Sequence, residues 1–156
     1  MKNSTLPEMK NLTFQRTFSA PRALVFKAWL DPKMMAEWWG PQGFTNPRCE
    51  LDARVGGKIH IDMCGPDGTI YPMTGEFKEI TEPERLVMMC YVPDGKGGHL
   101  LEVQNTAVFE VKGDTTKLTN NAKVVHAVAG ASGMIAGMEA GWTGSLERLK
   151  TLVEKP

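Results

Sequence analysis

The central part of the chain alternates apolar and polar residues in short runs. Between Cys49 and Val124, each run is separated from the next by a turn signal, such as Gly-Pro-Asp-Gly at 65–68 or Lys-Gly-Asp at 112–114. A period of two residues is typical of half-buried β-strands, and short connections rich in Gly, Pro and Asp join antiparallel neighbours. The pattern therefore predicts one antiparallel meander in the middle of the chain.

One further strand is predicted before this meander. Leu12, Phe14 and Phe18 share one face of an alternating run that starts at Asn11. Arg16 is the odd member of that face, and we expect it to have a structural partner such as a carboxylate. The meander and this strand together predict a sheet of six or seven strands.

Two short helices are predicted between the first strand and the meander. Ser19 is expected to cap the first helix, because its hydroxyl lies just before a proline, Pro21, in the first turn. An Asp-Pro pair at 31–32 ends that helix. A second short helix is then expected over about 32–39, where Gly40 follows.

The chain ends in a longer amphipathic pattern. Residues 132–154 carry apolar side chains at helical spacing, which predicts one helix of about 33 Å with Ser132 as its expected cap. Glycines recur along one edge, at Gly133, Gly137, Gly141 and Gly144. Two interpretations are open. The bare stripe lets another segment approach the backbone closely, or it leaves the first half of the helix loose enough to admit a ligand.

These elements predict an α+β fold in two layers, with the long helix on the concave face of a curved sheet. The 156 residues are the usual length of one domain, and we expect a single domain over 11–156 after a flexible tail over 1–10. Eighteen basic and eighteen acidic residues are scattered along the chain, which argues against nucleic-acid binding. The uncharged stretch 124–138 is too broken by glycines for a membrane span.

The cysteines bear on the compartment. Cys49, Cys64 and Cys90 are odd in number and widely spaced, which fits a reducing environment better than a disulfide scaffold. The N-terminal residues contain no apolar stretch of the kind that a secretory signal needs. A cytoplasmic protein is therefore expected.

Few residues point to catalysis or to a metal. His60, His99 and His126 are far apart in the sequence, and no His-x-x-x-His or paired-cysteine pattern is present. A Gly-x-Ser-x-Gly nucleophile motif is also missing. We expect no metal and no cofactor, no catalytic residue is assigned, and an enzymatic role is not favoured.

Polar residues on apolar strand faces are more informative. Asn105 and Asn120 fall on inward faces beside Ala107 and Ala122, and a buried amide needs hydrogen-bond partners. Either the two amides pair with each other, with the backbone or with buried water, or they point into a chamber and orient a ligand.

Large apolar side chains add to this picture. Of the ten methionines, those in the predicted sheet and long helix are either ordinary core or the lining of a cavity that accepts varied apolar shapes. Trp38 and Trp39 are adjacent and so point about 100° apart on a helix; the sequence leaves open which of them borders a chamber. The residues expected to bind a ligand are Trp39, Met63, Tyr71, Met73, Asn105, Asn120, Met134, Met138 and Trp142.

Four motifs, in order, resemble the START-like (SRPBCC) superfamily, and most closely its activator-of-heat-shock-ATPase type. They lie at 19–29 (Ser-Ala-Pro to Ala-Trp), 38–41 (Trp-Trp-Gly-Pro), 54–58 (Arg-Val-Gly-Gly-Lys) and 141–149 (Gly-Trp, then two leucines). The resemblance implies the helix-grip fold, in which the C-terminal helix and the curved sheet enclose a cavity. It does not imply one function, because similar proteins include polyketide cyclases, lipid carriers, plant-hormone receptors and a co-chaperone domain.

Three functions are therefore open. The favoured one is binding of an apolar or lipid-like small molecule in a chamber between the sheet and the last helix. A second is a co-chaperone-like module, with a chaperone or a second copy of the chain as its partner. The third is a cyclase-like enzyme whose chamber folds a reactive ligand.

Overall fold

The computed structural model describes residues 9–155 of the chain. Its strands are β1 (Asn11–Phe18), β2 (Thr45–Leu51), β3 (Lys58–Cys64), β4 (Ile70–Thr81), β5 (Arg85–Pro93), β6 (His99–Lys112) and β7 (Thr115–Ala127). Its helices are α1 (Arg22–Lys27), α2 (Pro32–Trp38), the 3-10 turn η1 (Ala129–Ala131), α3 (Ser132–Ala136) and α4 (Met138–Val153). In this part of the chain, seven strands form one antiparallel sheet in the order β1-β7-β6-β5-β4-β3-β2. The predicted α+β helix-grip fold is confirmed.

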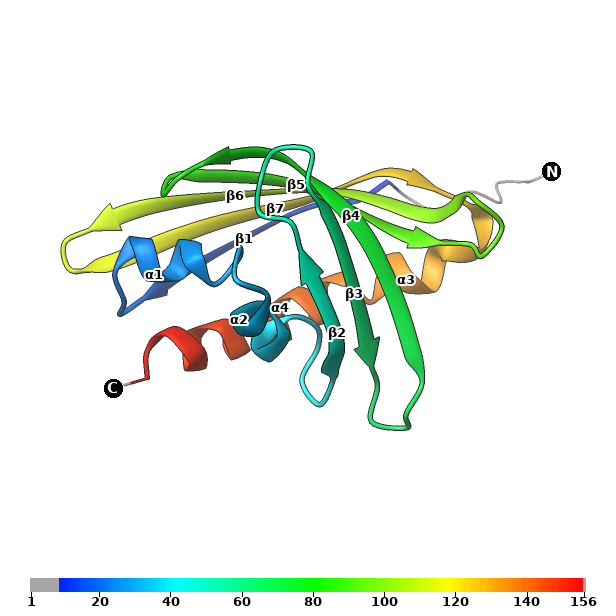
Figure 1. Cartoon of the computed structure of the whole chain (residues 1–156), viewed down its shortest axis with the longest axis horizontal. Coiled ribbons are helices and arrows are strands. Elements are labelled where there is room, and N and C mark those ends of the chain that lie inside the picture. Colours follow the sequence, from blue (N-terminus) through cyan, green and yellow to red (C-terminus); the bar gives the residue numbers. More distant parts are fainter. Residues whose placement is uncertain (1–8, 156) are drawn as a thin grey trace.

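The sheet is curved, and α4 lies across its concave side (Figure 1). Because β1 and β2 are the two edges of the sheet, the chain crosses from one edge to the other through α1 and α2. The first of these helices packs against β6 and β7, and the second packs against β2 and α4. Sheet, C-terminal helix and short helices therefore surround one interior.

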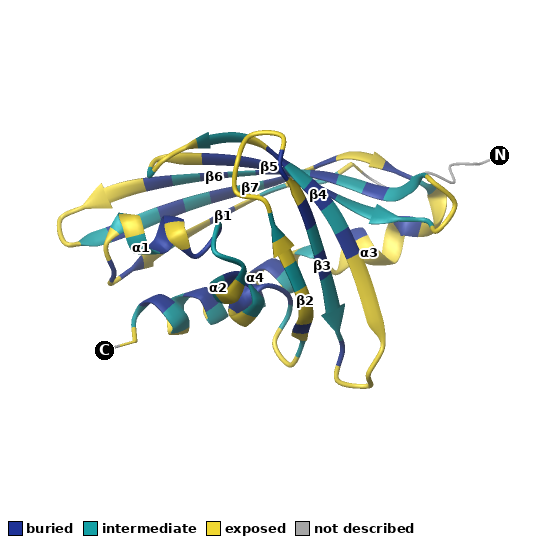
Figure 2. Ribbon diagram, in the orientation of Figure 1, coloured by how far each residue is buried: buried dark blue, intermediate teal, exposed yellow. Residues whose placement is uncertain are grey.

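Burial along the strands follows the alternation of the sequence (Figure 2). On β6, the side chains of Val103, Ala107 and Phe109 are buried on the concave face, whereas the alternate residues at 104, 106 and 108 are partly exposed. Leu146 and Leu149 of α4 are buried in the same core. Period two in the sheet and period 3.6 in the helix thus bring both apolar faces together.

Two of the turns depend on glycine. Gly68 closes the hairpin between β3 and β4 with φ +86°, and its N–H donates to the carbonyl oxygen of Gly65 at 2.9 Å. Gly113, between β6 and β7, has φ +64°. Both lie in the left-handed region, which glycine enters without a steric cost.

The helix caps differ from the sequence prediction. The N-cap of α1 is Pro21, so no side chain accepts a capping hydrogen bond at the start of this helix. Ser19 instead donates its backbone N–H to Oε2 of Glu154 at 2.8 Å. Ser132 is the first residue of α3 rather than its cap, and its hydroxyl donates to the carbonyl oxygen of Ala129. A side-chain cap is instead provided by Asp31, whose Oδ1 accepts from the backbone N–H groups at the start of α2.

The predicted single helix over 132–154 is interrupted at Gly137. This residue, at φ −86° and ψ −6°, separates α3 from α4. The helical bonds from Gly137 to Gly133 and from Gly141 to Gly137 are kept, at 3.1 and 2.9 Å. The prediction of a continuous helix is wrong at this residue, because glycine costs about 1 kcal/mol relative to alanine within a helix and three of them lie at successive turns.

Three smaller predictions concern Arg16, the N-terminus and the membrane. Nη1 of Arg16 donates to the carbonyl oxygen of Gln15 at 2.8 Å, so its partner is backbone and not a carboxylate. The tail predicted over 1–10 lies outside the described residues except for Met9 and Lys10, whose carbonyl oxygen accepts from the N–H of Val124. Within residues 9–155, no helix has both the length and the apolar character that crossing a bilayer requires.

Candidate ligand-binding chamber

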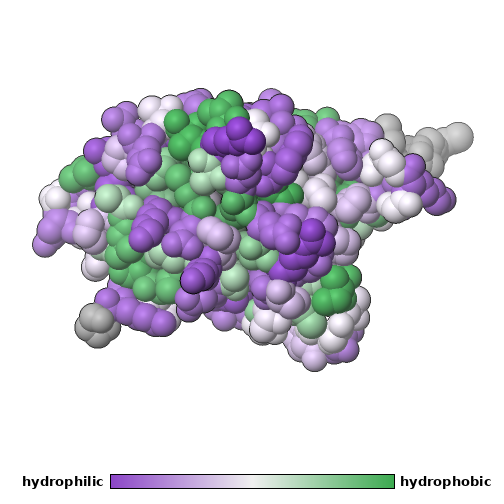
Figure 3. All heavy atoms as spheres, viewed as in Figure 1, coloured by the Kyte–Doolittle hydropathy of each residue, from purple (hydrophilic) through white to green (hydrophobic). Residues whose placement is uncertain are grey.

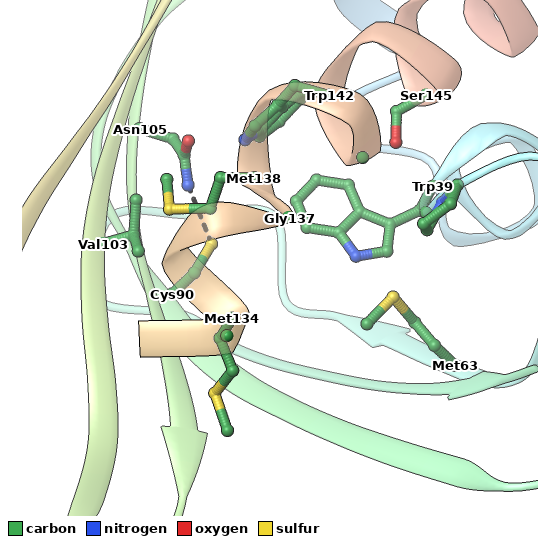
Figure 4. A pocket seen from close by; sticks show the side chains of 14 residues that line it. Trp39, Met63, Cys90, Val103, Asn105, Met134, Gly137, Met138, Trp142 and Ser145 are labelled. Atoms are coloured by element: carbon green, nitrogen blue, oxygen red, sulfur yellow. Dashed lines mark hydrogen bonds between the residues drawn. The ribbon is translucent and has the colours of Figure 1, made fainter. Parts of the chain in front are cut away.

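A hollow of about 290 Å³ lies between the concave face of the sheet, the C-terminal helices and the residues that follow α2. We call this hollow the chamber. Among the described residues that line it, none carries a charged side chain. Figure 4 shows its side chains from close by.

The sheet supplies one wall. Cys90 of β5 and Val103 of β6 are direct cross-strand partners, and Asn105 follows two residues further along β6. Met63, at the end of β3, lies on the opposite side of the chamber in Figure 4. Alternation in each strand turns these side chains toward the interior.

The C-terminal helices supply the second wall. Met134, Met138 and Trp142 recur every four residues and share one face. Gly133 and Gly137 lie beside them and add no side chain. Met134 is 39% exposed, so α3 borders the mouth of the chamber.

The third wall follows α2, and it shows how Trp38 and Trp39 differ. The indole N–H of Trp38 donates to the carbonyl oxygen of Ala28 at 2.8 Å, and Trp38 packs on Trp29 with ring centroids 4.8 Å apart. Trp39 lines the chamber and meets Trp142 edge to face at 5.4 Å. With Trp38–Trp39 at 5.6 Å and Trp29–Trp142 at 6.0 Å, the four indoles form a closed ring.

Asn105 is the polar feature of the sheet wall. It is 2% exposed, and its Nδ2 lies 3.2 Å from Sγ of Cys90. Its Oδ1 has no hydrogen-bond partner among the protein atoms of residues 9–155. Burial raises the pKa of Cys90 to about 12, so the thiol is neutral at physiological pH and is not an activated nucleophile.

The comparisons with known proteins agree with this architecture. A family model described as Activator of Hsp90 ATPase homolog 1-like protein matches residues 19–154. The chain belongs to this family. None of the curated proteins matches it in sequence.

Solved structures similar to this family member share its fold. One from Chromobacterium violaceum is 26% identical over 94% of this chain and 98% of its own, with a TM-score of 0.79. A solution structure from Arthrobacter aurescens is 25% identical over 94% and 87%, with a TM-score of 0.81. The AHSA1 protein from Silicibacter pomeroyi is 23% identical over 91% and 96%, with a TM-score of 0.75, and shows a likeness of fold.

In this member of the Activator of Hsp90 ATPase homolog 1-like family, most of the residues predicted to bind a ligand meet at the chamber. Those that line it are Trp39, Met63, Asn105, Met134, Met138 and Trp142. Tyr71, Met73 and Asn120 lie elsewhere. Tyr71 is 45% exposed near the tip of the β3–β4 hairpin, where it packs on Phe44 with ring centroids 5.8 Å apart.

Met73 and Asn120 are buried in the core outside the chamber. Met73 pairs with Ile61 of β3, and both are core residues. Asn120 pairs with Phe14 of β1 and Ala107 of β6, and it is fully buried. Neither atom of its amide group has a partner among the described protein atoms. The two amides face the same side of the sheet, but they lie at different points along it.

Several lining residues were not predicted from the sequence. Val103 carries the same alternation signal as Asn105 and could have been found from it. Cys90 lies in β5, where residues 86–90 are all apolar and buried, so alternation could not single it out. Ser145, Gly40 and Pro41 line the chamber because α4 meets the loop after α2. No pattern among neighbouring residues of the sequence predicts this contact.

The glycine stripe, Gly133 to Gly144, supports a different interpretation at each of its two ends. At Gly144 a Cβ would lie 3.1 Å from the backbone nitrogen of Gln42, so the loop after α2 approaches the helix closely there. At Gly133 a Cβ would meet no atom within 4 Å. The stripe is therefore a packing surface at one end and open at the other.

A second hollow lies on the convex face and differs in chemistry. Four of its polar side chains form two pairs: Nδ1 of His99 lies 2.8 Å from Oε2 of Glu102, and the hydroxyl of Tyr91 donates to Glu76 at 3.2 Å. His60 is likewise paired, with Asp62 at 3.0 Å. In residues 9–155, no three His, Cys, Asp or Glu side chains are grouped so as to hold a metal ion.

Proposed function

We propose that the protein binds one small, largely apolar molecule in the chamber. The observation that carries this proposal is an interior hollow lined by methionine, tryptophan, valine and glycine, without a charged side chain among its described residues. Sites for small molecules are typically concave, mostly apolar and equipped with a few polar groups, and their volumes start at roughly 300 Å³. The volume of about 290 Å³ fits a small ligand.

The lining also suits ligands of varied shape. Met63, Met134 and Met138 surround the space, and unbranched thioether side chains adapt their rotamers at low cost. The space-filling view shows apolar side chains scattered among polar ones on one face (Figure 3).

The chemistry of the lining supports binding rather than turnover. General acid–base catalysis needs a titratable group such as His, Asp, Glu or Lys close to the reacting atoms. The residues that line the chamber supply none of these, and the neutral thiol of Cys90 is a poor nucleophile. A cyclase-like reaction would have to rely on positioning alone.

The test is equilibrium dialysis with the neutral apolar probe N-phenyl-1-naphthylamine. We expect one probe per chain, and we expect the variant Gly137→Leu to weaken binding at least about tenfold because its side chain enters the chamber. A Cβ at Gly137 would meet backbone oxygens at 3.5 and 3.7 Å, which are ordinary contacts, so the variant should fold. The matched control is Ala136→Leu, which changes an exposed neighbour outside the chamber. Equal binding by both variants would contradict the proposal.

A second candidate is a co-chaperone-like module, favoured by the family description, Activator of Hsp90 ATPase homolog 1-like protein. Titration of purified Hsp90 with this chain, with ATP hydrolysis as the readout, tests it directly. Stimulated hydrolysis without any binding of the apolar probe would favour this candidate over the chamber.

A further inference from the structure

We infer that the ligand of the chamber is an uncharged molecule that carries a hydroxyl group, and that Asn105 binds this hydroxyl. The inference rests on the proposed function and names the class of ligand. It comes from three observations: the buried amide of Asn105, its thiol neighbour Cys90, and the absence of charge from the lining.

Asn105 offers a hydrogen bond that the described protein atoms do not take up. The residue is 2% exposed and lines the chamber, and Oδ1 has no partner in residues 9–155. Buried polar groups in folded proteins almost always have partners. In Figure 4 the amide lies beside Met138 and Trp142, on the wall opposite Met63. A ligand that fills the chamber therefore meets this amide.

The thiol of Cys90 determines which group suits the amide. Nδ2 of Asn105 lies 3.2 Å from Sγ of Cys90. A thiol is both a weak donor and a weak acceptor, and an amide carries a donor end and an acceptor end. Either end of the amide can therefore rest on Cys90 while the other end faces the chamber. A hydroxyl group donates and accepts, so it pairs with the amide in both orientations.

Charge on the ligand is disfavoured. A buried ion needs a partner of opposite charge or several hydrogen bonds, and the described lining supplies no charged side chain. One cation close to the chamber is Arg148, whose Nη1 would lie 3.9 Å from a Cβ at Gly40. Its Nη1 already donates to the carbonyl oxygens of Trp39, Gly40 and Pro41 at 2.9, 3.0 and 3.1 Å. It is therefore engaged with the backbone and is poorly placed to receive a carboxylate.

The orientation of the ligand follows. Asn105 belongs to β6, inside the sheet, whereas Met134, at 39% exposed, borders the mouth. We expect the hydroxyl end to lie against the sheet and the apolar end to lie among Met134 and Met138. Acids of the same shape should be excluded.

The experiment uses two probes of nearly equal shape, 2-naphthol and 2-methylnaphthalene, which differ by a hydroxyl against a methyl group. Dissociation constants are measured by equilibrium dialysis with the full chain. In the unmodified protein we expect 2-naphthol to bind at least as tightly as 2-methylnaphthalene, although water solvates the hydroxyl better. In Asn105→Leu we expect the affinity for 2-naphthol to fall about tenfold, which corresponds to one net hydrogen bond. The affinity for 2-methylnaphthalene should stay within about threefold.

Two controls define the comparison. Asn120→Leu removes a buried amide on the same face of the sheet but outside the chamber, and it should leave the ratio of the two affinities unchanged. The anion 2-naphthoate should bind at least about tenfold more weakly than 2-naphthol. If Asn105→Leu does not fold, Asn105→Val replaces it, since valine suits a strand.

The outcomes separate this inference from the proposed function. Failure of both neutral probes and of N-phenyl-1-naphthylamine to bind would overturn the chamber itself. Binding of both neutral probes with the same affinity ratio in the unmodified protein and in Asn105→Leu would leave the chamber standing and overturn the role of Asn105. Tighter binding of 2-naphthoate than of 2-naphthol would overturn the preference for an uncharged ligand.

Discussion

Nη1 of Arg148 lies 2.9 Å from the carbonyl oxygen of Trp39, so α4 holds the backbone of a residue that lines the chamber. The same guanidinium also donates through Nη2 to the carbonyl oxygen of Glu37 at 2.9 Å. Partial burial lowers the pKa of Arg148, but an arginine stays protonated at physiological pH. One side chain of the last helix thus ties down the end of α2 and the loop that follows.

Replacing Arg148 should loosen this wall. In Arg148→Met, which keeps an unbranched apolar stem but removes the guanidinium group, we expect a loss of about 1–3 kcal/mol in the free energy of unfolding, because several carbonyl oxygens lose a charged donor. Arg148→Lys should not restore it, since an ammonium group lacks the planar fork that reaches several carbonyls. Urea unfolding measures the effect. As a control, Arg85→Met removes an exposed pair with Glu79 and should cost at most about 1 kcal/mol. Equal losses in both variants would show that the hydrogen bonds of Arg148 stabilise the protein no more than an exposed ion pair does.

The two ends of the glycine stripe should respond in opposite ways to alanine. Gly133→Ala should raise the free energy of unfolding by about 0.5–1 kcal/mol, because alanine is the better helix former and the site is open. Gly144→Ala should lower it, since its Cβ would press against the backbone of Pro41 and Gln42 at 3.4 and 3.1 Å. Thermal unfolding of the two variants tests this pair. If both substitutions stabilise the protein, the loop after α2 moves away from the added Cβ at low energetic cost.

Hydrogen exchange should distinguish α3 from α4. Ile135 is the buried residue of α3, whereas α4 buries Leu146, Leu149 and Val153 among others. Because α3 buries little surface and the helix is interrupted at Gly137, we expect the amides of 133–141 to exchange faster than those of 146–152. They should slow when N-phenyl-1-naphthylamine is bound. Uniformly strong protection of both segments in the free protein would show that the interrupted helix does not open.

The thiol of Cys90 should resist alkylation in the folded protein. Burial raises its pKa to about 12, so at pH 8 almost none of it is thiolate, whereas an unfolded cysteine near its ordinary pKa of about 8.5 is partly ionised. In a chain with Cys49→Ser and Cys64→Ser, we expect iodoacetamide to react at least about 100-fold more slowly before unfolding in urea than after. The rate should rise only well above pH 9. Fast reaction at pH 8 would show that the sheet wall is open to solvent.

The sheet could be predicted because its signals are local. Alternation along β6 and the glycines at the hairpins are properties of neighbouring residues. The same alternation placed Asn105 and Asn120 on one face, which is where both lie. What alternation cannot supply is the position of each along the strand relative to the helix that covers it. Asn105 therefore lines the chamber, whereas Asn120 lies in the core beside Phe14.

The other differences between the sequence-based predictions and the structure also arise from features that alternation does not reveal. The choice between Trp38 and Trp39 depends on the carbonyl oxygen of Ala28, which accepts from the Trp38 indole. Tyr71 has the alternation of an inward residue, but it lies near the tip of the β3–β4 hairpin, where it is exposed. Helical periodicity continues through Gly137 in the sequence, so the break there depends on the weak helix propensity of glycine and not on the apolar pattern.

The closed ring of indoles gives the protein a built-in optical signal. Trp29, Trp38, Trp39 and Trp142 are all the tryptophans of the chain, and neighbouring ring centroids lie between 4.8 and 6.0 Å apart. At such distances, excitation of one indole is shared with the others. Two members of the ring line the chamber, so we expect the entry of a ligand to change the intrinsic fluorescence of the whole set. Occupancy of the chamber can thus be followed in the unlabelled protein.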